Sequence, residues 1–69
     1  MNSDLSRTDI ERVVDEWIIG RNGERNRSII KRRMIDGVTF EKLAEEFDIS
    51  VQQAKNIVYK CQSIIFKHL

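Results

Sequence analysis

Residues 39–60 read TFEKLAEEFDISVQQAKNIVYK, and this stretch decides the fold because it predicts two helices joined by a tight turn. Thr39 is suited to cap the first helix, since its hydroxyl can accept a backbone N–H bond from the first turn. Asp48 interrupts the helical pattern and tolerates the left-handed backbone conformation that such a turn requires. Ser50 and Gln53 have the spacing of a capping box, which predicts that a second helix begins directly after Ser50.

Apolar residues recur at helical spacing on both sides of this turn. They are Leu43, Ala44 and Phe47 in the first helix, and Val51, Ala54, Ile57 and Val58 in the second. Two short amphipathic helices, the second starting at a serine cap, are the arrangement of the DNA-binding helix-turn-helix.

Two further helices are expected before this motif. Thr8 and Glu11 have the spacing of a capping box, so the first helix should begin there and end at Gly20. Trp17 falls on its apolar stripe and is predicted to anchor the core. An Asn-Gly turn follows, and the second helix is expected over residues 24–36, with Gly37 as its stop signal.

After Ser50 nothing in the sequence breaks the helical pattern, so the last helix should continue to the C-terminus, over about 19 residues. The chain therefore predicts an all-α fold, a small four-helix domain containing a helix-turn-helix without a wing. We expect residues 1–7 to form a flexible N-terminus and residues 8–69 to form a single domain, with the motif at residues 39–60.

Composition narrows the function classes. The single cysteine, Cys61, excludes an internal disulfide and fits a structural role in a reducing compartment. The only histidine, His68, has no carboxylate or serine near it in sequence, and no Gly-rich phosphate loop is present. A metal site would need more His or Cys ligands than the chain has. We therefore expect no enzyme, no cofactor and no metal, and the absence of a long apolar run predicts no membrane span.

The net charge of +1 conceals an uneven distribution. Residues 1–20 carry −3 and residues 34–50 carry −4, whereas residues 21–33 carry +5 and residues 51–69 carry +3. Phosphate binding depends on local charge, so a one-sided basic surface would be sufficient for DNA. The alternative for residues 21–33 is a solvated face crossed by salt bridges, which we favour for that segment alone.

The run ERNRSIIKRRMIDGVTFEKLAEEFDISVQQAKNIVYK, residues 24–60, resembles the fourth conserved region of bacterial sigma factors. That region reads the upstream promoter element, and output domains of response regulators share the same pattern. The resemblance implies a helix-turn-helix fold, and for a sigma-like protein it also implies contact with RNA polymerase. Val51, Gln52 and Gln53 stand where members of the family often carry Arg or Glu, so the base preference of the family does not transfer to this chain.

The candidate site residues follow from the motif, because the N-terminal end of its second helix enters the major groove. Amide side chains suit adenine and a lysine suits guanine or phosphate, so the predicted base contacts are Gln52, Gln53, Lys55 and Asn56. The predicted backbone contacts are Arg32, Arg33, Thr39, Lys42, Tyr59 and Lys60. The alternative for the amides is that they only solvate an exposed helix face.

Two function classes remain open at this stage. The first is sequence-specific binding of double-stranded DNA, as a transcription regulator or minimal sigma-like factor of a phage or mobile element, in the cytoplasm and associated with the nucleoid. The second is a protein-interaction module that keeps the helix-turn-helix scaffold without binding DNA.

One DNA-binding domain of this size reads few base pairs, so RNA polymerase or a second copy would have to add affinity. A homodimer would form through the apolar end of the last helix: Ile64, Ile65, Phe66 and Leu69. The alternative is that these residues close the core of the monomer against Trp17 and Ile18.

Overall fold

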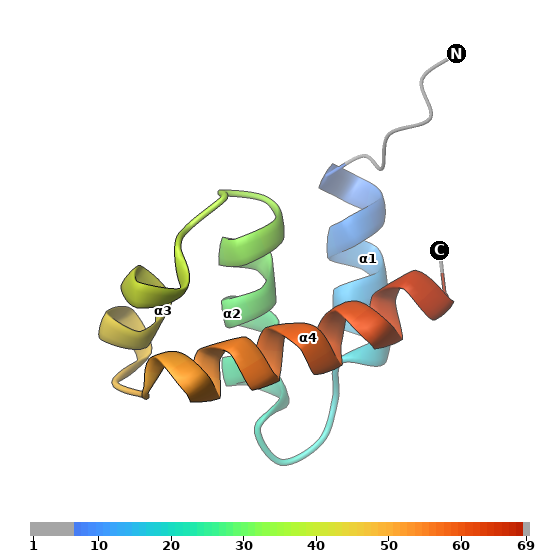
Figure 1. Ribbon diagram of the computed structural model, residues 1–69. Helices are drawn as coiled ribbons and strands as arrows, with labels where there is room; N and C mark the ends of the chain where they lie inside the picture. The colour runs from blue at the N-terminus through green and yellow to red at the C-terminus, as the bar shows by residue number, and fades with distance from the viewer. Residues whose placement is uncertain (1–6, 69) are drawn as a thin grey trace.

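The computed structural model describes residues 7–68, which form four helices joined by short loops and no strand (Figure 1). The helices are α1 (Arg7–Trp17), α2 (Gly23–Met34), α3 (Phe40–Phe47) and α4 (Val51–Lys67). The predicted all-α, four-helix fold is confirmed. The expected flexible segment 1–7 and the terminal Leu69 lie outside the described residues, except for Arg7, which belongs to α1.

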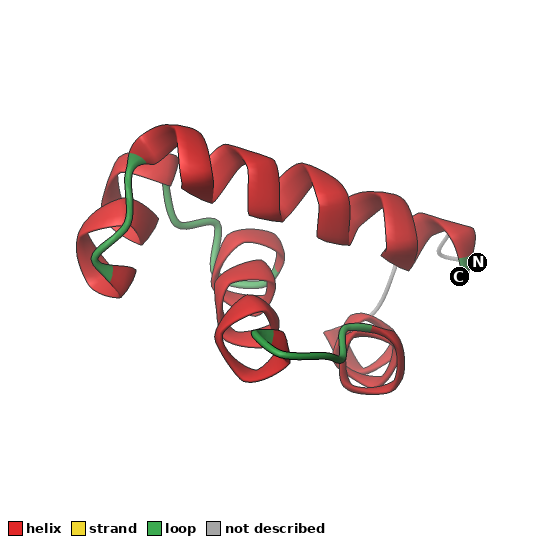
Figure 2. Ribbon diagram, turned by 90° about the horizontal axis from the view of Figure 1, so that it is seen from below, coloured by secondary structure: helices red, strands yellow, loops and turns green. Residues whose placement is uncertain are grey.

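The long helix α4 lies across the other three helices. Helices α1 and α2 run side by side in opposite directions, and α4 crosses both of them (Figures 1 and 2). The short α3 packs against α2 and against the first half of α4, and it does not contact α1 within the described residues. The start of α4 therefore lies at the end of the molecule beside α3, away from α1.

The core forms where α4 crosses the helix pair. Its buried members come from all four helices, and four of them lie on one face of α4: Ala54, Val58, Cys61 and Ile65. Ile29, Ile30 and Leu43 from α2 and α3 are fully inaccessible to solvent. Burial raises the pKa of the Cys61 thiol, so this side chain is a small apolar group in the core, as its position in the sequence predicted.

The turn between α3 and α4 forms as the sequence predicts. The Thr39 hydroxyl accepts the N–H of Lys42 at 3.2 Å, and Asp48 adopts the left-handed conformation with φ 55° and ψ 49°. At the start of α4, Ser50 Oγ accepts the Gln53 N–H at 3.0 Å, and Gln53 Oε1 accepts the Ser50 N–H at 3.2 Å. The capping box is complete. Thr39, Asp48, Ser50 and Gln53 therefore set the direction in which α4 leaves the turn.

The boundaries of the first two helices differ from those expected. Arg7 is already helical and bonds Glu11 at 3.3 Å, so Thr8 lies inside α1 and does not cap it. Helix α1 ends at Trp17 rather than at Gly20. Helix α2 covers residues 23–34 rather than 24–36, and the left-handed Gly37, with φ +69°, follows in the loop.

Trp17 is not a core anchor, and that prediction is wrong. Its side chain is 46% exposed, and its ring stacks on the ring of His68 with centroids 3.7 Å apart. Ile18, the next residue, is buried, and its N–H still donates to the Val14 carbonyl at 2.9 Å, so it lies on the same apolar stripe as Val14. Periodicity placed Trp17 on the apolar stripe, but its ring meets His68 at the end of α4, which leaves it half exposed.

The apolar residues at the end of α4 do not all have the same surroundings: some close the core of the monomer, and one is exposed. Ile65 is fully buried and Ile64 packs at the margin of the core, so both close the monomer. Phe66 is 58% exposed. Only Phe66 is therefore available, among the described residues of this segment, as a large apolar contact for a second chain.

A substitution at Ala54 tests the crossing of α4 over the core. Ala54 is completely buried, so Ala54→Leu should overpack the interface and lower the free energy of unfolding by about 1–3 kcal/mol. Urea denaturation measures the change. Ser63→Leu on an exposed position of the same helix is the control and should change stability little. Equal stability of Ala54→Leu and wild type would contradict this packing.

Candidate nucleic-acid interface

The first turns of α4 present polar side chains to solvent. The helix buries one face in the core, and on the opposite side Gln52, Gln53, Asn56 and Lys60 are exposed. The serine cap and the left-handed Asp48 set the direction of α4, so these side chains project from a rigid element. A helix that is anchored along one face and polar along the other can enter a groove without rearranging.

Gln52 and Asn56 form a connected pair. The side-chain nitrogen of Gln52 donates to the Asn56 Oδ1 across one helical turn at 3.1 Å. This bond leaves the Gln52 oxygen, the second Gln52 N–H and the Asn56 amide group to face a ligand. The arrangement keeps both donors and an acceptor on the exposed surface, which is the combination that recognises an adenine edge.

Gln53 has the capping role that its spacing from Ser50 predicted, and this role bears on its predicted contact with a base. Its side-chain oxygen completes the capping box, so the carboxamide is held against the start of α4. A bidentate base contact would compete with this bond. Of the three amides that the sequence selected, Gln52 and Asn56 are therefore better placed to read bases than Gln53.

Lys55 and Tyr59 both contact Phe40, although Tyr59 remains 56% exposed. The Lys55 ammonium lies 5.9 Å from the centre of the Phe40 ring, and the Tyr59 ring meets Phe40 edge-on with centroids 5.9 Å apart. The Arg33 guanidinium lies over the same ring at 4.3 Å. We call Arg33, Phe40, Lys55 and Tyr59 the Phe40 cluster. It joins α2, α3 and α4 beside the exposed amides.

Arg33, Lys55 and Tyr59 were each predicted as contact residues from the sequence, whereas Phe40 was not. Phe40 follows the Thr39 cap and reads as an ordinary apolar residue of α3. Its contacts come from residues on two other helices, so helical spacing alone contains no signal for them. A phenylalanine directly after a cap, in a motif with lysine and tyrosine on the facing helix, is the only hint that the sequence offers.

The remaining backbone candidates differ in how available they are. Thr39 and Lys60 are exposed, and the Thr39 hydroxyl is engaged in the cap of α3. Lys42 is 57% exposed in its side chain and makes a long ion pair with Glu45 at 3.7 Å. Such an exposed pair contributes little and yields easily to a phosphate.

Arg32 is the candidate that the structure favours least. It makes a two-pronged contact with Glu46, at 3.1 Å and 2.6 Å, and a further bond to Asp36 at 3.1 Å. Hydrogen bonding to Glu46 and Asp36 raises the pKa of Arg32, and the bond from Arg32 lowers the pKa of Glu46. A phosphate contact would require Arg32 to give up this link between α2 and α3.

The other basic residues of α2 also serve internal contacts. Arg27 donates to the Ile18 carbonyl at 2.8 Å, Lys31 pairs with Asp15 at 2.9 Å, and Arg33 donates to the Val38 carbonyl at 2.9 Å. Gly23 makes room for the first of these, since a Cβ there would lie 2.9 Å from the Arg27 guanidinium. The basic stretch 21–33 is thus largely a set of ties from α2 to its neighbours, as the salt-bridge reading predicted.

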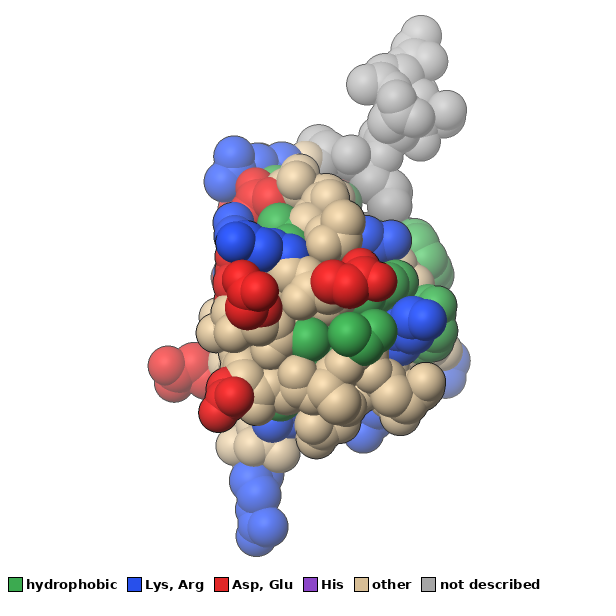
Figure 3. All heavy atoms as spheres, turned by 60° about the vertical axis from the view of Figure 1, so that its left-hand side comes forward, with side chains coloured by type: hydrophobic (Ala, Val, Ile, Leu, Met, Phe, Trp, Pro, Cys, Tyr) green, Lys and Arg blue, Asp and Glu red, His purple; other side chains and the backbone are tan. Residues whose placement is uncertain are grey.

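The face that includes α3 carries both signs of charge. Figure 3 shows acidic side chains beside lysines and arginines on this face, with no continuous basic surface. Glu41 and Glu45 of α3 are exposed. The face therefore offers a polyanion local cations rather than a uniformly basic surface.

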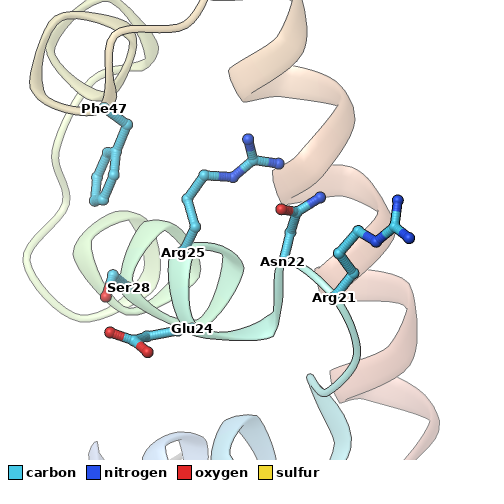
Figure 4. Close-up of a pocket in the computed structure, with 6 residues that line it drawn as sticks. All are labelled: Arg21, Asn22, Glu24, Arg25, Ser28 and Phe47. Carbon is cyan, nitrogen blue, oxygen red and sulfur yellow. The ribbon is translucent and has the colours of Figure 1, made fainter.

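A hollow of about 460 Å³ lies on another part of the surface, between the start of α2 and the end of α3 (Figure 4). Arg21, Asn22, Arg25 and Ser28 line it, and Phe47 closes one side. Glu24 also belongs to its lining, and Arg25 bonds Asn26 at 3.3 Å. The hollow is open and mixed in charge, and it lies at the end of α3 opposite to the Phe40 cluster.

Other kinds of site find no support within residues 7–68. No group of three or more His, Cys, Asp or Glu side chains in this part of the chain is arranged to hold a metal ion. None of the four helices is long and apolar enough to cross a membrane. Comparisons of the chain with protein-family models, curated proteins and solved structures found no match.

The pair Arg32–Glu46 gives a pH-dependent prediction. Because the pKa of Glu46 is lowered in the folded protein, the pair stabilises the fold above the ordinary glutamate pKa of 4.5 and is lost as pH falls through the lowered value. Glu46→Gln should therefore lower the melting temperature at neutral pH, and the difference from wild type should shrink towards about pH 3.

The matched control is Glu45→Gln, which removes the neighbouring, more exposed carboxylate. Its melting temperature should stay close to that of wild type throughout. A Glu46→Gln deficit that is the same at neutral and acidic pH would show that the ion pair is not its cause.

Proposed function

We propose that this protein binds double-stranded DNA in a sequence-specific manner through α4, and that it acts as a transcription regulator or a minimal sigma-like factor. The observation that carries the proposal is the unit of α3, left-handed Asp48 and capped α4, whose first turns are exposed and amide-rich. This unit has the arrangement by which a recognition helix enters the major groove.

The side chains around the start of α4 support a division between reading and anchoring. Gln52 and Asn56 are linked at 3.1 Å and exposed, so together they suit an adenine edge. Lys55 lies between these two amides in the sequence, Tyr59 and Lys60 follow them on α4, and all three suit backbone phosphates. Thr39 and Lys42 at the start of α3 extend this anchoring side. The resemblance of residues 24–60 to sigma region four points to the same class of ligand.

The direct test is selection from a random pool of duplex DNA, followed by affinity measurements over a series of salt concentrations. Specific binding should recover a consensus, and its affinity should fall steeply with salt, because lysine contacts to phosphate release counterions. Recovery of no consensus and no salt-dependent binding would contradict the proposal.

Substitutions on α4 separate reading from anchoring. Gln52→Ala should reduce discrimination between the selected site and a site changed at one base pair by about 1–3 kcal/mol. Asn56→Ala should have a similar effect, and the double variant should lose less than the sum, because the two amides act as a pair.

Lys60→Ala is the contrasting variant for this experiment. It should weaken binding to all duplexes alike and reduce the salt slope by about one. If Gln52→Ala and Asn56→Ala also weakened every duplex equally, the assignment of base reading to these amides would be wrong.

The second candidate function is an interaction with a protein partner through the same scaffold. Its specific support is the exposure of large apolar side chains on the described surface: Ile19 at 71%, Phe66 at 58% and Trp17 at 46%. The partner would be RNA polymerase or a second copy of the chain. An apolar contact of this kind should respond little to salt, in contrast to DNA binding.

Sedimentation of the protein at micromolar concentration tests the second copy. A homodimer through Phe66 should dissociate in Phe66→Glu, while Ser63→Glu, on an exposed neighbouring position, should leave the assembly unchanged. Two paired chains would place their recognition helices on a palindromic site with half-sites about 34–36 Å apart. A wild-type protein that sediments only as a monomer would remove the homodimer.

A further inference from the structure

Phe40 occupies the centre of a contact set drawn from three helices. The Arg33 guanidinium of α2 lies 4.3 Å from its ring centre, and the Lys55 ammonium of α4 lies 5.9 Å from it. The Tyr59 ring of α4 approaches at 71°, with centroids 5.9 Å apart. Cations favour the face of an aromatic ring and a second ring favours its edge, so these geometries are attractive ones.

The Phe40 ring has a fixed position. Its side chain is half-buried and packs against the hydrophobic core, and the preceding Thr39 caps α3 through its hydroxyl. Arg33 is held independently, because its guanidinium also donates to the Val38 carbonyl at 2.9 Å. The ring is thus a rigid surface against which the more flexible Lys55 side chain rests.

Lys55 and Tyr59 lie one turn apart on α4, on the side of the helix nearest the start of α3. Gln52 and Asn56, the exposed amide pair, flank Lys55 in the sequence. A group that orients Lys55 and Tyr59 therefore also sets the positions of the Lys55 ammonium and the Tyr59 hydroxyl beside the amides. An unrestrained lysine would have to be ordered on binding, at a cost in entropy that a preorganised one avoids.

We propose that Phe40 is a positioning residue for DNA binding, whose ring holds Lys55 and Tyr59 in the orientation in which they contact the DNA backbone beside the bases read by Gln52 and Asn56. This inference rests on the proposed function and deepens it, since it assigns to α3 a role in ordering the phosphate contacts of α4. Phe40 itself need not touch the DNA.

The competing explanation is that Phe40 only fills space at the edge of the core. The chain contains its own control for this, because Phe47 is a second half-buried phenylalanine of α3 that packs on the same core. Phe47 lies at the other end of the helix, beside the hollow lined by Arg25 and Ser28 (Figure 4). A purely structural role predicts similar consequences for both residues.

The experiment compares Phe40→Leu, Phe40→Tyr and Phe47→Leu in the full chain. Each is titrated with the selected duplex over a salt series, and its melting temperature is recorded. Phe40→Leu should weaken DNA binding roughly two- to fivefold, the range expected for loss of a cation–aromatic contact. Its salt slope should fall by about one, as expected when one lysine no longer engages a phosphate.

Phe40→Tyr retains the ring and should bind with the affinity and salt slope of wild type. Phe47→Leu should also retain both, whatever its melting temperature. Phe40→Leu with the affinity and slope of wild type would overturn the inference. Equal changes in Phe40→Leu and Phe47→Leu would overturn it as well, because they would show a general effect of core packing.

A measurement without DNA examines the cluster directly. In wild type the Lys55 side-chain protons near the ring should be shifted upfield in the proton NMR spectrum, and the shift should vanish in Phe40→Leu. Lys55 protons at ordinary positions in wild type would overturn the inference alone. A wild-type protein that shows the upfield shift but binds no duplex would overturn the proposed function, and the role of Phe40 in DNA binding with it.

Discussion

The capped turn between α3 and α4 is the constraint on which the rest of the structure depends. Asp48 takes a left-handed conformation, and the reciprocal bonds of Ser50 and Gln53 start α4 immediately afterwards. This local geometry sets the direction of a helix that supplies the core with Ala54, Val58, Cys61 and Ile65 further along. The same helix axis determines which polar side chains face outward, so the core and the candidate interface are two sides of one element.

The charged residues of different helices have different roles, which the net charge of the chain does not show. The basic residues of α2 are used to hold that helix to α1 and α3, through Lys31–Asp15 and Arg32–Glu46. The acids of α3 partly serve this purpose and partly remain exposed. Because α4 carries no acidic residue, its lysines are left for a polyanion, together with the exposed Lys42 of α3. A net charge near neutrality is therefore compatible with a locally basic helix.

The caps of the turn between α3 and α4 could be predicted from neighbours in sequence, although the cap expected at Thr8 could not, and features set by neighbours in space were missed. The caps at Thr39 and Ser50 each depend on a residue three positions away, and both form as expected. Trp17 was misplaced because the helical period identifies a face but not where the covering helix ends. Its stacking partner, His68, belongs to the other end of the chain. The internal use of the α2 arginines likewise depends on acids and carbonyls that only the fold brings near.

In the candidate interface, too, some features follow from sequence spacing, and others depend on contacts that only the fold creates. The exposed amides of α4 follow from the motif, because the face opposite the apolar stripe must be solvated. The spacing from Ser50 indicated that Gln53 belongs to the capping box, but spacing alone cannot supply that Gln52 is bonded to Asn56. Nor can it place Lys55 against Phe40, since that contact depends on how α3 crosses α4. The choice among equivalent polar residues is therefore made by the turn and the crossing, the two features that also hold the core together.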